Sequence, residues 1–158
     1  MDDLARRIGE RLKASRERLV TAESCTGGWA AQVVTSVAGS SEWFERGFVT
    51  YSNDAKQESL GVPAGVLKKF GAVSEETARG MALGALARSK ASVALSITGV
   101  AGPTGGSTSK PVGTVCFAWT GGGAVRSETR HFEGDRESVR RQSVVRALEG
   151  VIELLDSA

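Results

Sequence analysis

The stretch LVTAESCTGGW, residues 19–29, joins a short apolar run to a polar turn that ends in two adjacent glycines. Residues 19–22 are apolar enough for a buried strand, and the glycines allow a tight turn after it. A helix is predicted to follow this turn. Its apolar face consists of Trp29, Ala30, Val33, Val34 and Val37. Such a strand–turn–helix unit favours an α/β protein with a partly parallel sheet.

The rest of the chain extends this unit in both directions. Further helices are predicted over residues 2–15, from Ser52–Asp54 through Lys56 to Leu60, from Ser74 onward, and from Asp135 to the C-terminal region. Further strands are predicted over residues 47–51, 92–98, 112–120 and 124–132, the last two joined by a glycine turn as a hairpin. Gly61 and Pro63 are expected to break the helical pattern. The order predicts a three-layer α/β/α fold with a mixed sheet.

Length and composition limit the possible classes of protein. The 158 residues suggest one domain over residues 1–158, and a net charge of +2 is too balanced to indicate a nucleic-acid partner. Two cysteines, Cys25 and Cys116, and the single His131 do not make a zinc site of cysteine and histidine ligands, so no metal is expected. Neither a membrane-spanning run nor a signal-peptide core is seen. We therefore expect a cytoplasmic protein with free thiols and no membrane partner.

The polar turn is a candidate binding loop. In open α/β sheets, ligands bind beyond the carboxyl ends of the strands, where Ser24 and Thr26 would offer hydroxyl groups. Gly27 and Gly28 would let a phosphate approach the backbone closely. The loop matches neither a Walker A motif nor a GxGxxG fingerprint. A capped turn without a ligand is the alternative.

A second glycine-rich loop, GVAGPTGG at residues 99–106, follows the strand that ends at Thr98. Two such loops after two strands favour one shared site, lined by Thr98, Gly99 and Gly102. The alternative is a flexible surface connection.

Residues 39–56, GSSEWFERGFVTYSNDAK, contain the chain's only tyrosine between serines and a lysine. Ser41, Tyr51 and Lys56 could supply a nucleophile, a proton relay and a base, since a lysine can activate a serine when burial lowers the lysine pKa. Ser24 is the main rival nucleophile. A mechanism based on the Cys25 thiol would need a histidine base.

Six arginines accompany the last strand and helix, and most are expected on a solvated face beside glutamates. They are Arg126, Arg130, Arg136, Arg140, Arg141 and Arg146. The GDR sequence at residues 134–136 stands at a predicted helix start, where an arginine could reach a phosphate.

Five segments together resemble one family. TAESCTGGW, GSSEWFERGFVTYSNDAK, GAVSEETA, SITGVAGPTGGSTSKPVGTV and GDRESVRRQ read in order like the CinA C-terminal domain family, from about residue 4 to 155. Its enzymatically assigned members are nicotinamide mononucleotide deamidases of the PncC type. The amino-terminal nucleotide-processing domain of many CinA proteins is not expected here.

The resemblance implies hydrolysis of the carboxamide of nicotinamide mononucleotide to the carboxylate with release of ammonia, in pyridine nucleotide recycling. It implies no cofactor, no metal and a homo-oligomer. Carried over by motif, the catalytic residues are Ser41, Tyr51 and Lys56, and Ser24 and Thr98 line the pocket. The glycine loops and Arg136 or Arg140 would serve the nucleotide. A non-catalytic nucleotide-sensing or competence-linked interaction module is the alternative, although it would have no use for a nucleophile with a base.

Overall fold

A five-stranded mixed sheet lies at the centre of the computed structural model, which describes residues 1–157. The strands are β1 (Leu19–Glu23), β2 (Phe44–Val49), β3 (Val93–Gly99), β4 (Thr114–Gly121) and β5 (Ala124–His131). Their order across the sheet is β2-β1-β3-β4-β5. β1 pairs in parallel with β2 and β3, whereas β4 pairs antiparallel with β3 and β5. The predicted parallel portion and antiparallel hairpin are both confirmed.

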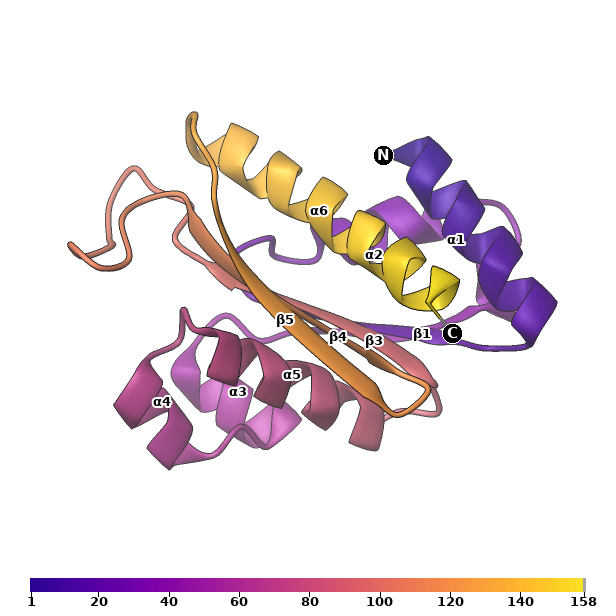
Figure 1. The fold of residues 1–158 in the computed structure, drawn as a ribbon, viewed down its shortest axis with the longest axis horizontal. Helices are drawn as coiled ribbons and strands as arrows, with labels where there is room; N and C mark the ends of the chain where they lie inside the picture. Colours follow the sequence, from indigo (N-terminus) through magenta and orange to yellow (C-terminus); the bar gives the residue numbers. More distant parts are fainter. Residues whose placement is uncertain (158) are drawn as a thin grey trace.

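Helices cover both faces of this sheet (Figure 1). One face carries α1 (Asp2–Ser15), α2 (Trp29–Thr35) and α6 (Arg136–Asp156). The other carries α3 (Asn53–Leu60), α4 (Ala64–Phe70) and α5 (Glu75–Ala87). A short 3₁₀ helix, η1 (Ser40–Glu42), leads into β2. The three-layer α/β/α fold predicted from the sequence is confirmed.

Alternation along the central strands supplies a separate apolar core to each helical layer. Leu19, Leu95 and Ile97 point to the layer of α1, α2 and α6, whereas Val20 and Ala94 belong to the core under α5. Each of the leucine, isoleucine and valine side chains contributes roughly 1.5–3 kcal/mol when fully buried. These two cores fix which residues of each strand face which helical layer. They therefore also fix the direction of the side chains at the strand ends.

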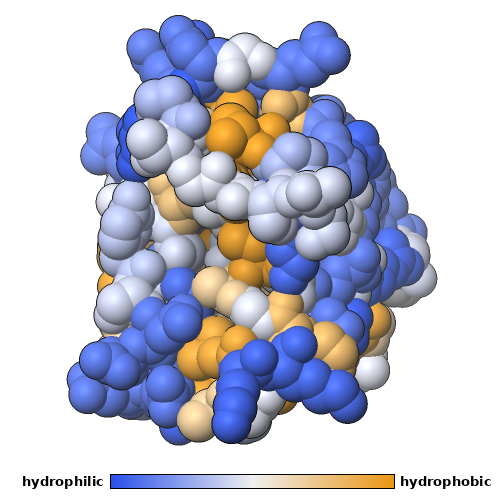
Figure 2. Space-filling model, turned by 90° about the vertical axis from the view of Figure 1, so that its left-hand side faces the viewer, coloured by the Kyte–Doolittle hydropathy of each residue, from blue (hydrophilic) through white to orange (hydrophobic). Residues whose placement is uncertain are grey.

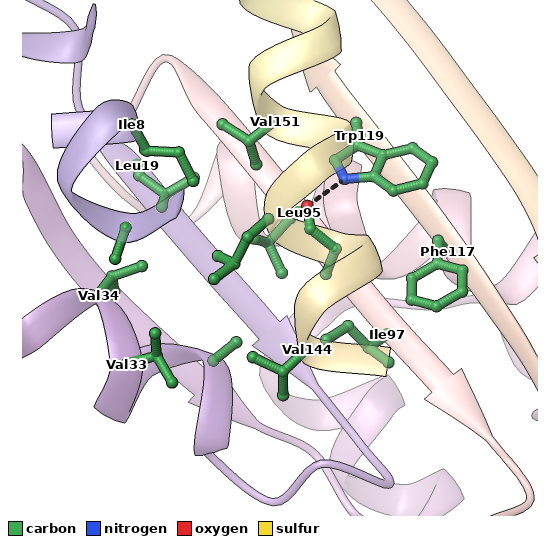
Figure 3. Packing of buried hydrophobic residues seen from close by; sticks show 14 of the residues in the cluster. Ile8, Leu19, Val33, Val34, Leu95, Ile97, Phe117, Trp119, Val144 and Val151 are labelled. Atoms are coloured by element: carbon green, nitrogen blue, oxygen red, sulfur yellow. Dashed lines mark hydrogen bonds between the residues drawn. The ribbon is translucent and has the colours of Figure 1, made fainter. Parts of the chain in front are cut away.

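Close packing of α6 on the sheet depends on a glycine. The indole of Trp119 donates a hydrogen bond from Nε1 to the Ala147 carbonyl, 2.9 Å away (Figure 3). A Cβ at Gly150 would overlap this indole. The small residue therefore lets the helix lie directly on Trp119.

Two elements differ from the sequence prediction. Gly61 does end α3 in a left-handed conformation, but Pro63 stands at the N-cap of α4, a helix that was not predicted. A proline lacks an N–H, and a helix start has no intrahelical partner for one, so the residue suits that place. β2 begins at Phe44 rather than at residue 47. It is a half-exposed edge strand, so its hydrophobic pattern is weak.

Candidate active site

The end of β1 sends two polar side chains to opposite faces of the sheet. Glu23 points to the α2 side, where it is buried and accepts hydrogen bonds from Thr26 Oγ1 at 2.6 Å and from the Ala30 N–H at 2.8 Å. It also accepts from the Ala31 N–H at 3.1 Å, and so anchors the start of α2. By strand alternation, Ser24 points the other way, toward α3.

Lys56 meets Ser24 on the α3 side. Its Nζ donates hydrogen bonds to Ser24 Oγ and to the Thr50 carbonyl, each 2.8 Å long. The Ser52 hydroxyl caps α3 by accepting from the Ala55 N–H, which fixes the turn that carries Lys56. The sequence thus places a lysine one helical turn inside α3, aimed at the end of β1.

The environment of Lys56 makes its neutral amine more populated than that of a lysine in water. The side chain is 1% exposed, and no carboxylate within residues 1–157 forms an ion pair with it. Burial lowers the pKa of Lys56 from 10.5 to about 8. A neutral Lys56 can accept the hydroxyl proton of Ser24, which is the geometry of a nucleophile beside its base.

A pocket of about 240 Å³ opens onto this pair at the carboxyl ends of β1 and β3. It is lined by Ser24, Cys25, Tyr51, Lys56, Ala72, Val73, Thr98, Gly99, Ala101, Gly102, Thr104 and Arg136. Thr98 Oγ1 donates to the Ala72 carbonyl at 2.8 Å, and so ties the strand end to the segment before α5. Figure 2 views this side of the molecule, where separate hydrophobic patches lie one above the other between more hydrophilic flanks. A larger pocket of about 500 Å³ beside α5 contains neither Ser24 nor Lys56.

Arg136 spans the mouth of the pocket from the first residue of α6. One of its nitrogens donates to the Gly102 carbonyl at 2.8 Å, and another donates to the Tyr51 hydroxyl at 3.1 Å. Tyr51 is 63% exposed, and no hydrogen bond joins it to Lys56 in the described part of the chain. A charged guanidinium and an aromatic ring therefore stand together at the entrance.

Ser41 lies apart from Lys56 in the structure. The sequence suggested that it stands beside Lys56, but it lies in η1, exposed, and its carbonyl accepts a hydrogen bond from Arg18 at 3.4 Å. η1 precedes β2 and Lys56 follows it, so the six residues of β2, roughly 20 Å of strand, separate them. Within one copy of the chain, Ser24 and not Ser41 is the serine paired with Lys56.

Other residues of the predicted binding set divide into two groups. Ser24, Thr98, Gly99, Gly102 and Arg136 line the pocket. The remaining four do not line it: Thr26, Gly27, Gly28 and Arg140. The Thr26 hydroxyl is engaged by Glu23, while Arg140 donates to backbone carbonyls of the turn. The two glycines have left-handed φ angles of 61° and 103° and shape the turn.

Comparisons with known proteins show the family of the chain. The model of the CinA C-terminal domain matches residues 1–155. The chain belongs to the CinA C-terminal domain family. A nicotinamide-nucleotide amidohydrolase PncC from Pseudomonas putida is 54% identical over 96% of this chain and 94% of its own. A protein of the same name from Escherichia coli K12 is 54% identical over 92% and 89%. The crystal structure of competence/damage inducible protein CihA from Agrobacterium tumefaciens matches with a TM-score of 0.94 at 48% identity, over 97% and 94% of the two chains.

In this CinA domain, sequence reasoning missed pocket residues that are small and apolar. Ala72, Val73 and Ala101 have no functional group that a motif search would find. The first two belong to the GAVSEETA segment, which entered the sequence analysis only through the family resemblance. Thr104 also lines the pocket and was not predicted, although its side chain is polar. Cys25 lines the pocket, although the sequence analysis considered it only as an alternative nucleophile and not as a binding residue. Within residues 1–157, no cluster of three or more histidine, cysteine or carboxylate side chains is placed to hold a metal ion. No helix there is both long and apolar enough to cross a membrane.

Proposed function

We propose that this protein is a nicotinamide-nucleotide amidase that hydrolyses the carboxamide of nicotinamide mononucleotide to nicotinate mononucleotide and ammonia. The observation that carries the proposal is the buried Lys56 amine, 2.8 Å from Ser24 Oγ at the base of a pocket. A serine with a neutral lysine base suits attack on an amide. The substrate in this proposal is taken from the names of the relatives, which are nicotinamide-nucleotide amidohydrolases. A pure binding module would have no need to bury a lysine without a carboxylate.

The reaction proceeds in two halves at this pair. Ser24 Oγ bonds to the carboxamide carbon while Lys56 takes the hydroxyl proton. The ammonium of Lys56 then gives that proton to the amide nitrogen, the carbon–nitrogen bond breaks, and ammonia leaves an ester on Ser24. Water attacks the ester as Lys56 removes its proton, and Ser24 is reprotonated as the acyl–oxygen bond breaks. The product carries a carboxylate.

The entrance of the pocket suits the rest of the substrate. The pyridinium ring of the substrate is positively charged, and the exposed Tyr51 ring offers a face for a cation–π contact. The 5′-phosphate would bind Arg136, a guanidinium at the first residue of a 21-residue helix. Tyr51 thus acts in substrate binding in this proposal, since its hydroxyl faces Arg136 and not Lys56.

A thiol mechanism is disfavoured by the state of Cys25. Burial raises the pKa of Cys25 to about 12, so its reactive thiolate is scarce at neutral pH. No proton acceptor like Lys56 is bonded to its sulfur within residues 1–157. Serine is therefore the nucleophile in our scheme.

We also propose that the protein is a cytoplasmic homo-oligomer that serves pyridine nucleotide recycling. Both cysteines are free, which fits a reducing compartment. Exposed apolar side chains at Val49 on β2 and Val125 on β5 lie on the two edge strands of the sheet, where a second copy could pair. Sedimentation at micromolar concentration would measure the oligomeric state.

The test of the amidase proposal is a product assay on the purified protein. Incubation with nicotinamide mononucleotide should release ammonia and nicotinate mononucleotide in equal amounts, with and without a chelator. Lys56→Met should abolish both products, whereas Lys68→Met at an exposed position should leave them unchanged. Absence of ammonia from the wild-type protein would overturn the proposal.

A further inference from the structure

Arg140 donates hydrogen bonds to the backbone of the turn that follows Ser24. From α6, its Nε donates to the Cys25 carbonyl at 3.0 Å, and its Nη2 donates to the Thr26 carbonyl at 3.2 Å. The guanidinium is held over the Trp29 ring, 5.5 Å from the ring centroid. Arg140 does not line the pocket. Its contacts therefore act on the backbone and not on a ligand.

Holding a carbonyl also fixes the N–H of the same peptide. A peptide unit is planar and trans, so its N–H points opposite to its carbonyl oxygen. The Thr26–Gly27 peptide illustrates this: its carbonyl faces Arg140, and its N–H, on Gly27, donates to the Ser24 carbonyl at 3.0 Å. The Cys25–Thr26 peptide has its carbonyl on Arg140 as well, so the Thr26 N–H points away from α6.

The Thr26 N–H is available for a ligand. Within residues 1–157 neither it nor the Cys25 N–H donates to an acceptor, while the Ser24 and Gly27 N–H groups donate to the Ile97 and Ser24 carbonyls. A backbone N–H close after a nucleophile is well placed to stabilise the oxyanion that forms when the nucleophile attacks a carbonyl. Thr26 follows Ser24 by two positions, with only Cys25 between them.

We propose that Arg140 is a positioning residue that aims the Thr26 N–H at the oxyanion of the tetrahedral intermediate formed on Ser24. The inference rests on the proposed amidase function and adds to it the donor that stabilises the developing charge. It also gives Arg140 a role other than binding the phosphate, for which Arg136 at the pocket mouth is placed.

The test compares Arg140→Gln and Arg140→Lys with a matched control. Arg141→Gln changes the next residue, which also lies over Trp29, at 5.9 Å, but pairs with the exposed Glu137. Loss of one oxyanion donor lowers kcat by roughly 100–1000-fold. Because Arg140→Gln misaligns the donor without deleting it, we expect a fall of about 10–100-fold in kcat with KM changed by less than about 3-fold. Arg140→Lys should have a kcat between those of Arg140→Gln and wild type. Arg141→Gln should have the wild-type kcat.

A second readout separates this role from a merely structural one. The aldehyde analogue of nicotinamide mononucleotide can add to Ser24 and place an oxyanion in the site, whereas the product nicotinate mononucleotide cannot. Arg140→Gln should weaken aldehyde inhibition by the same factor as kcat and leave product inhibition within about 3-fold. Equal weakening of both inhibitors, or a rise in KM at constant kcat, would overturn the inference. Because wild type is assayed in parallel, absence of wild-type ammonia release would instead identify a failure of the amidase proposal.

Discussion

Titration of Lys56 should control the rate of the reaction. Its pKa is lowered from 10.5 to about 8 by burial, and only the neutral amine can take the proton of Ser24. About one-tenth of the free enzyme then has a neutral Lys56 at pH 7 and about nine-tenths at pH 9. We therefore predict that kcat/KM rises about tenfold between these values, with a midpoint near pH 8. Stopped assays of ammonia in buffers of constant ionic strength would measure it.

The same shift changes the stability of the fold. Between pH 8 and 10.5 the folded protein has released the Lys56 proton, while the unfolded chain still binds one, so the free energy of unfolding rises with pH. The shift of about 2.5 pKa units corresponds to roughly 3 kcal/mol. Urea unfolding of wild type and Lys56→Met at pH 7 and 10.5 isolates this contribution, because other titrating groups cancel in the difference. A flat kcat/KM profile together with a stability difference that does not change with pH would refute the reasoning.

Three further predictions concern the surroundings of the site. Arg136→Gln should raise KM for nicotinamide mononucleotide roughly 10–100-fold through loss of a charge-assisted contact, and leave activity on the phosphate-free riboside unchanged; equal effects on both would contradict its role. Asp135→Ala removes the carboxylate that caps α6 by accepting a hydrogen bond from the Ser138 N–H, 2.9 Å away. It should lower the free energy of unfolding by about 1 kcal/mol, seen by calorimetry as a Tm about 2–4 °C lower. Gly150→Ala places a Cβ against Trp119 and should destabilise the fold by about 1–3 kcal/mol with kcat unaltered at 25 °C; an unchanged Tm would show that α6 can shift.

The sequence predicted the layers because periodicity reports burial directly. Residues 19–22 and 92–98 are mostly apolar on both faces, as strands covered on both sides tend to be, and they form the neighbouring strands β1 and β3, which are almost entirely buried. The two glycine-rich loops then had to meet at one edge of the sheet. That inference depended only on the parallel direction of the two strands, and it located the pocket.

The pairing of side chains within the pocket could not be predicted in this way. Ser41 and Lys56 are close in sequence but lie at opposite ends of β2, whereas Ser24 is distant in sequence and in contact. Arg136 and Arg140 share one face of α6, one turn apart, so periodicity cannot distinguish them. Which one faces the pocket depends on how the helix is placed against the turn at residues 24–28.

The most direct test of the central claim is ammonia release from nicotinamide mononucleotide by Ser24→Ala and Ser41→Ala, each checked for folding by circular dichroism. Pairing of Ser24 with Lys56 predicts that Ser24→Ala loses several orders of magnitude in kcat, as loss of a covalent nucleophile does. Ser41→Ala should stay within about 2-fold of wild type, since its side chain is exposed at the far edge of the sheet. A folded Ser24→Ala protein that retains activity would contradict the account.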